Sequence, residues 1–202
     1  MKKIVSIFFA CLCAYVSNAQ TPASWYHYTE EFWFVKEVPA SSLQGKNFRY
    51  EIAVKADPAD SLSRARIHGV GIDAGQQHLL NSGFTVETRT EQEWTIYTVV
   101  GKVLPTMHKL SFYASVNGNG QFYFDDISFY VEEQPGRWKQ QSLFNASFEE
   151  KQPDIFAGFA VNKRRSFNIQ TRLTSDVYKT GQQSLLVITK GASPIIATAQ
   201  TE

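Results

Sequence analysis

Apolar and polar residues alternate with a period of two along most of this chain, and aromatic residues are frequent among the apolar ones. The clearest case is the segment 47–55 (NFRYEIAVK). Its alternate apolar residues all project from one face of an extended strand: Phe48, Tyr50, Ile52 and Val54. No long segment keeps the 3.6-residue period of an amphipathic helix. The pattern therefore predicts an all-β protein built from half-buried strands.

Turn signals divide the chain into short strands. We expect strands at 31–38, 47–55, 64–73, 84–88, 93–100, 109–116, 121–131, 158–162, 168–173 and 184–189. The residues 117–120 (NGNG) indicate a hairpin, because Asn-Gly supplies the positive φ angles of tight turns. The segments 36–42 and 74–81 form a turn of helix at most, and the small-residue tail 191–202 is expected to fray. Many short strands with turns at this spacing are typical of a β-sandwich.

The first nineteen residues have the pattern of a secretory signal peptide. Two lysines precede an apolar run at 4–16, and 17–19 (SNA) supply the small residues of a cleavage site. The run is short for a membrane anchor, and the residues before Cys11 and Cys13 make poor lipidation motifs. Both cysteines lie inside this segment, so the mature chain has no disulfide. We therefore expect a secreted or periplasmic protein without a membrane span after cleavage.

Composition narrows the function classes. Of the 202 residues, 43% are hydrophobic, which is enough for a packed core. The formal net charge is +1, so there is no electrostatic argument for a nucleic-acid partner. The chain has no Gly-x-Ser-x-Gly, His-Glu-x-x-His or glycine-rich phosphate motif, and its four histidines lack metal-ligand spacing. We expect no catalysis, although carboxylates far apart in sequence can meet in space, which leaves a glycosidase pair open.

Four segments carry a family resemblance. The segment 120–129 (GQFYFDDISF) has an apolar run followed by Asp-Asp, an aliphatic residue and Ser. The segment 144–149 (FNASFE) has Asn, a small residue and Phe-Glu, with Pro and Gly-Phe further on. The segments 178–185 (YKTGQQSL) and 43–50 (LQGKNFRY) each place a glycine before a strand. Together they resemble the carbohydrate-binding modules of the galactose-binding-like superfamily. The resemblance implies an antiparallel jelly-roll β-sandwich that binds a glycan.

The order of these segments differs from the family pattern. In the family the Phe-Glu opening precedes the Asp-Asp strand, whereas here it follows it. We divide the chain into a signal peptide at 1–19, a main β-sandwich module at 20–133 and a second part at 138–202. The second part either completes the same sandwich, which we favour, or begins a truncated second module. An isolated half-sandwich would expose its edges and apolar faces, which is costly.

The segment 184–188 (SLLVI) supports a completed sandwich. It is apolar on both faces, as in a strand that is covered on both sides. The segments 168–173 and 184–189 should therefore pair with, or pack on, strands of the first part.

The resemblance also implies a structural calcium ion. In the family, the Glu of Phe-Glu and an Asp of Asp-Asp commonly bind it. These residues correspond here to Glu149, Asp126 and, as a further candidate, Asp125. Calcium prefers several oxygen ligands, which carboxylates and backbone carbonyls provide. The alternative is that Asp125 and Asp126 end a strand and Glu149 is solvated.

Aromatic side chains are the candidates for ligand contacts, because sugar rings pack their C–H faces on indole and phenol rings. The candidate residues are Trp25, Tyr28, Trp33, Trp94 and Trp138. In β-rich chains such residues are also common as core residues and cross-strand partners, so both roles stay open. We predict a non-catalytic, carbohydrate-binding-like module. The alternative is an accessory or interaction module of a larger secreted hydrolase or surface assembly.

Overall fold

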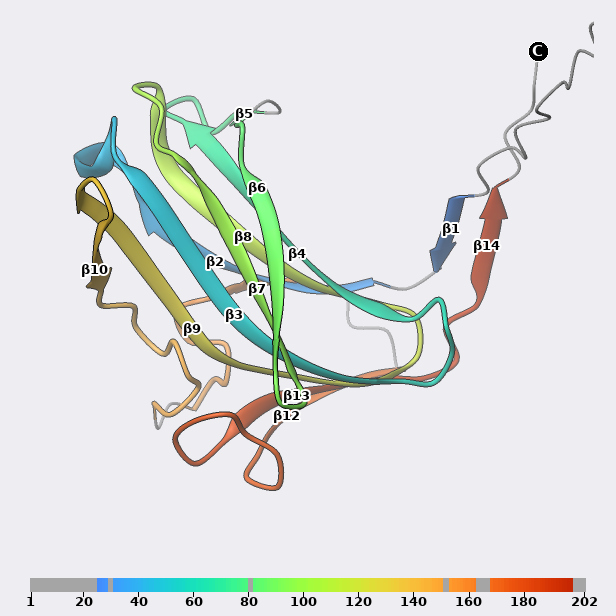
Figure 1. The fold of residues 1–202 in the computed structure, drawn as a ribbon. Helices are drawn as coiled ribbons and strands as arrows, with labels where there is room; N and C mark the ends of the chain where they lie inside the picture. The colour runs from blue at the N-terminus through green and yellow to red at the C-terminus, as the bar shows by residue number, and fades with distance from the viewer. Residues whose placement is uncertain (1–24, 29–30, 80–81, 151–152, 163–167, 198–202) are drawn as a thin grey trace, which may run out of the picture.

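The computed structural model describes residues 25–28, 31–79, 82–150, 153–162 and 168–197. In these residues all regular structure is β-strand, apart from one 3-10 turn, η1 (Ser41–Leu43). The all-β prediction is confirmed, and the strands form two large antiparallel sheets that lie one against the other (Figure 1). The described residues contain no helix of the length and apolarity needed to cross a bilayer. The signal peptide predicted at 1–19 lies outside the described residues.

The larger sheet has seven strands, with β9 at its centre. Its order is β12 (Ile169–Thr174), β13 (Ser184–Thr189), β9 (Gly120–Gln134), β3 (Asn47–Pro58), β7 (Trp94–Lys102) and β6 (Thr85–Glu91), with β10 (Arg137–Gln141) also paired to β9. Strand β9 pairs with β3 on one side. On its other side it pairs with β13 near its start and with β10 near its end.

The smaller sheet has five strands. Its order is β11 (Ala160–Val161), β2 (Glu31–Pro39), β8 (Met107–Asn117), β4 (Arg64–Asp73) and β5 (His78–Leu79). Residues 78–79 therefore form an edge strand where the sequence predicts at most a helical turn, because they find backbone partners on β4. The strand predicted at 158–162 is shorter than expected, since only its residues 160–161 pair with β2.

A third, two-stranded ladder joins the two ends of the described chain. Strand β1 (Trp25–Tyr28) pairs antiparallel with β14 (Pro194–Ala197). In Figure 1 this ladder stands to one side of the two large sheets. The prediction that the tail 191–202 frays is thus wrong for 194–197, because a partner strand distant in sequence satisfies its backbone.

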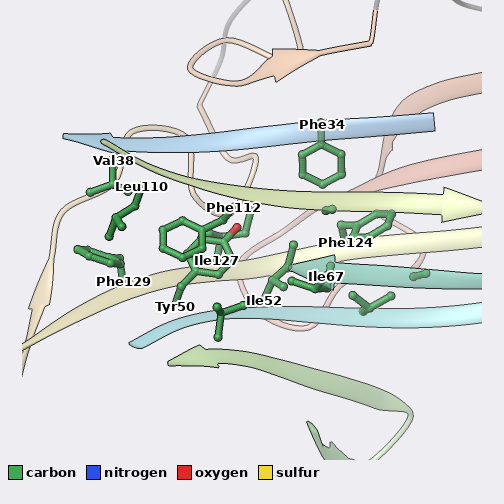
Figure 2. Close-up of a cluster of buried hydrophobic side chains, with 14 of the residues drawn as sticks. Phe34, Val38, Tyr50, Ile52, Ile67, Leu110, Phe112, Phe124, Ile127 and Phe129 are labelled. Carbon is green, nitrogen blue, oxygen red and sulfur yellow. The ribbon is translucent and has the colours of Figure 1, made fainter. Parts of the chain in front are cut away.

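The main core lies between the two large sheets. The alternating residues of β3 that the sequence places on one face, Phe48, Tyr50, Ile52 and Val54, are all at most 3% exposed. From the opposite sheet, Phe34 of β2 meets Phe124 of β9 edge to face, with ring centroids 5.1 Å apart. Figure 2 shows Phe34, Tyr50, Ile52 and Phe124 among the side chains that fill the space between the strands. Burying one such side chain contributes about 1.5–3 kcal/mol, so this layer dominates the stability of the fold.

The C-terminal part of the chain contributes a strand to this core. Strand β13 lies between β9 and β12, and the pairing predicted for 184–189 with the first part is observed. Leu185 and Val187 enter the main core. Leu186, which points to the other face, is only 1% exposed, so the strand is covered on both sides as its apolar pattern predicts.

Candidate functional site

A groove of about 520 Å³ lies on the outer face of the seven-stranded sheet, away from the core. Its lining combines outward-facing side chains of β6, β7, β3 and β9 with the segment 140–147 and one residue of the β12–β13 connection. The side chains that can hydrogen-bond include Glu51, Arg89, Asp126, Ser128, Gln140 and Lys179. The groove is therefore a polar surface built from segments that are far apart in the sequence.

A β-bulge in β9 shapes the groove. The β3–β9 register shifts between Glu51 and Ala53, where two residues of β9, Asp126 and Ile127, face a single residue of β3. Asp126 has a φ of 55°, in the left-handed region that few non-glycine residues adopt. The displaced N–H of Ile127 donates to the carbonyl of Ala146 at 3.1 Å, which ties the segment 140–147 to β9. Bulges commonly re-aim a side chain beside a functional site.

Five charged side chains form one connected array in and beside the groove. The Lys179 ammonium lies 3.0 Å from an oxygen of Glu91 and 3.2 Å from an oxygen of Asp126. The Arg89 guanidinium lies 2.9 Å from Glu91 and 3.0 Å from Glu51. The array runs from β9 through the β12–β13 connection to β6 and ends on β3. Its charges alternate in sign, so each cation is flanked by two carboxylates.

The array stabilises the charged forms of Glu91, Lys179 and Arg89. Hydrogen bonds from Lys179 and then from Arg89 lower the pKa of Glu91. Burial acts to lower the pKa of Lys179, but hydrogen bonds to Glu91 and Asp126 outweigh it, and its pKa is raised. The pKa of Arg89 is raised chiefly by its hydrogen bond to Glu51. Because solvent-exposed ion pairs add only about 0–1 kcal/mol each to stability, the array contributes chiefly a fixed pattern of donors and acceptors.

Asp125 anchors the β12–β13 connection to the central strand. Its side chain is fully buried, and its Oδ2 atom accepts backbone hydrogen bonds from Lys179 at 2.7 Å and Thr180 at 3.2 Å. Its Oδ1 atom accepts a further bond from the N–H of Asp126. Burial raises the pKa of Asp125 to about 6, against the effect of these three N–H donors. Asp125 thereby positions the backbone from which Lys179 reaches the groove.

Glu149 holds the next part of the same connection. Its Oε1 atom accepts hydrogen bonds from the backbone N–H groups of Gln182 at 2.8 Å and Gln183 at 3.0 Å. Gly181 packs against this carboxylate, since a Cβ atom placed there would lie 2.3 Å from Oε1. Its φ of +73° also favours glycine. The acid and the glycine together fix the course of the connection.

The calcium prediction can be compared with this arrangement. The structure brings Asp125, Asp126 and Glu149 to the same connection, where Asp125 and Glu149 already accept hydrogen bonds from backbone N–H donors. The Oδ1 atom of Asp126 accepts the Thr180 hydroxyl at 2.6 Å, and its Oδ2 atom faces the Lys179 ammonium. Among the described residues, no group of three or more His, Cys, Asp or Glu side chains could hold a metal ion. Calcium takes about six to eight oxygens, so an ion bound by these residues would have to displace those donors.

The aromatic candidates whose side chains are described, Trp33, Trp94 and Trp138, lie on three different strands. Trp94 is 6% exposed and packs with Ala53 and Ile96 in a small cluster, so it offers little surface to a ligand. Trp33 lies on β2, in the other sheet. Trp25 and Tyr28 belong to β1, and their side chains lie outside the described part of the structure.

Trp138 lies on β10, next to the groove. The guanidinium of Arg49 sits over its ring at 5.2 Å and over the ring of Tyr130 at 4.5 Å. Tyr130 itself lines the groove. These three side chains therefore extend the outer face beyond the charged array with two aromatic rings and a cation between them.

Sequence reasoning did not identify most of the groove. It named Asp126 in the groove and Trp138 beside it, but not Arg89, Lys179 or Tyr130. Lys179 falls within a segment that carries the family resemblance, and Arg89 lies in a run of alternating charges, 87–91 (ETRTE). Neither signal indicates that Arg89 and Lys179 both pair with the carboxylate of Glu91.

No family model matches this chain, and searches among curated proteins and solved structures find no match. The chemistry of the groove is therefore the basis for a functional hypothesis.

Proposed function

We propose that this protein is a secreted, non-catalytic glycan-binding module with a jelly-roll β-sandwich, and that the groove on the seven-stranded sheet takes the sugar. One observation carries the proposal. The groove joins a hydrogen-bonded array of charged side chains, including Arg89, Asp126 and Lys179, to a half-buried aromatic residue, Tyr130. The signal-peptide pattern and the family resemblance of the sequence support the same reading.

The chemistry of the groove suits a polyhydroxylated ligand. A sugar hydroxyl donates one hydrogen bond and accepts others, so it is best bound where donors and acceptors alternate. Arg89 and Lys179 supply N–H donors, while Glu51 and Asp126 supply acceptor oxygens. Hydrogen bonds to charged groups are about twice as strong as neutral ones. Small-ligand sites typically combine a few such polar groups with aromatic surface.

The ion pairs also make the groove ready to bind. Each charged side chain of the array already forms an ion pair at hydrogen-bond distance. For example, the Arg89 guanidinium lies 3.0 Å from a carboxylate oxygen of Glu51. Such preorganisation reduces the side-chain entropy lost on binding. Because the cations are paired, the groove favours a neutral sugar over an anionic one.

The experiment is affinity gel electrophoresis of the protein from residue 20 onward on xyloglucan, galactomannan and mixed-linkage β-glucan, with pull-down on insoluble cellulose and chitin. We expect retention on at least one of these polysaccharides. The variants Arg89→Ala and Lys179→Ala should each weaken it by about tenfold, the loss of roughly one charge-assisted hydrogen bond.

Lys139→Ala is the matched control. It removes another surface lysine that pairs with a glutamate, Glu133, at 3.1 Å and does not line the groove. It should leave retention unchanged. Lack of retention on the whole panel, or equal weakening by the control and by the groove variants, contradicts the proposal.

A further inference from the structure

A row of rings crosses the outer face of the five-stranded sheet, on the side opposite the groove. Tyr113 of β8 lies at its centre. The ring of His68, from β4, is parallel to the Tyr113 ring within 4°, with centroids 4.8 Å apart. The ring centroid of Trp33, from β2, lies 6.0 Å from that of Tyr113. The ring centroid of His78, from β5, lies 6.5 Å from that of Tyr113. Four neighbouring strands thus contribute one ring each.

The row is separate from the core. The neighbours of these residues in sequence, such as Phe34, Ile67 and Phe112, belong to the main core, so the rings project from the other face of the same strands. His68 and His78 are exposed, and Trp33 and Tyr113 are half-buried. A depression of about 290 Å³ adjoins the row, and both histidines line it.

The electrostatics of this face suit an uncharged ligand. Burial is the main cause that lowers the pKa of His68, which favours the uncharged form of its ring. Charged residues of both signs flank the row. Glu31 and Arg66 act on His68 from β2 and β4, and Glu37 pairs with Lys109 at the other end. This balance offers nothing to a phosphate backbone, which requires a surplus of cations.

We propose that the row formed by Trp33, Tyr113 and His68 is a second glycan-contacting surface, on which sugar rings stack by their C–H faces. A pyranose presents flat C–H faces and a rim of hydroxyl groups, and flat rings bordered by charged side chains match both. The inference rests on the proposed function, since both surfaces take a glycan. It adds that the module contacts glycan from two opposite faces, so it can cross-link chains or gain avidity on an insoluble polysaccharide.

The test uses the same polysaccharide panel and the full protein from residue 20 onward. Trp33→Ala and Tyr113→Ala should each weaken retention by about tenfold, as expected for loss of one stacking ring. Tyr113→Phe keeps the ring and should retain binding, which separates stacking from loss of the fold. Phe144→Ala is the matched control, because Phe144 is an aromatic residue 50% exposed outside the row. Circular dichroism melting of each variant verifies the fold.

The outcomes separate this inference from the proposed function. Retention weakened by Arg89→Ala but unchanged by the row variants overturns the second surface alone. Retention weakened by the row variants and unchanged by Arg89→Ala upholds the row and contradicts the groove. Failure of the unaltered protein to bind any polysaccharide overturns both. If Trp33→Ala changes only the sedimentation coefficient, the row is a contact between copies of the chain, and the inference is wrong.

Discussion

The Oδ2 atom of Asp125 lies 2.7 Å from the backbone nitrogen of Lys179 and accepts its hydrogen bond, although 54 positions separate the two residues in the chain. This contact joins a buried carboxylate of the central strand to the connection that completes the groove. It also sets where the Lys179 side chain begins, and hence where its ammonium can meet Asp126 and Glu91. The groove therefore depends on a residue that does not line it.

Replacing that carboxylate should destabilise the protein and loosen the connection. Asp125→Asn keeps the size of the side chain but turns an N–H₂ group toward backbone N–H donors on one side. We expect a loss of about 1–3 kcal/mol in the free energy of unfolding, measured with urea. Hydrogen exchange at the amides of Lys179 and Thr180 should accelerate. Asp57→Asn, at an exposed position, is the control and should have no comparable effect. Unchanged exchange at both amides would show that Asp125 does not hold the connection.

Lys36 should make stability depend on pH in the alkaline range. The residue is 4% exposed, and its ammonium donates to the carbonyls of Phe144 and Gly158 and lies 4.2 Å from the centroid of the Phe159 ring. Burial lowers its pKa from 10.5 to about 8. Between these two pH values the unfolded chain binds more protons than the folded one. Stability from this group therefore rises with pH in that window.

The comparison variant is Lys36→Met, which keeps the apolar stem and cannot titrate. The stability of the unaltered protein relative to this variant should increase between pH 8 and pH 10, by up to about 3 kcal/mol over the whole window. Urea unfolding of both proteins at several pH values measures the difference. A difference that stays constant with pH would mean that the lysine is not held in its buried position.

Strand β13 should be essential to the stability of the whole sandwich. Leu185 is fully buried in the main core, between residues of both large sheets. Leu185→Ala should cost about 2–5 kcal/mol and leave a single unfolding transition if 138–202 folds together with 20–133. Leu104→Ala, at a position 36% exposed, should cost much less. Two separate transitions, with only one shifted by Leu185→Ala, would support the reading of a second, independent unit.

Calcium should not alter the stability of this protein. The oxygens of Asp125, Asp126 and Glu149 already accept hydrogen bonds from the β12–β13 connection. A bound ion would have to displace these donors and the Lys179 ammonium. We expect the same thermal unfolding midpoint in excess calcium and in excess EDTA. An upward shift with calcium that is removed by Asp126→Asn would instead establish the metal site.

Local patterns in the amino-acid sequence are enough to place most of the β-strands and the faces that they bury. Period-two alternation is a local property, so 47–55 could be assigned a buried face before any neighbour was known, and Phe48 and Tyr50 lie on that face. The doubly apolar pattern of 184–188 likewise indicated a strand covered on both sides, as β13 is. The bounds of β4 and β13 agree with the prediction for the same reason.

Which residues share a site follows from the pairing of distant strands and not from any local pattern. Alternation shows which face of a strand is buried but leaves open which strand lies beside it and in which register. The single extra residue in β9 turns Asp126 toward the groove. The pairing of β13 with β9 brings Lys179, in the β12–β13 connection, to the same groove. The row of Trp33, Tyr113 and His68 likewise exists only because β2, β8 and β4 are neighbours. Such contacts depend on long-range pairing, and no local pattern encodes them.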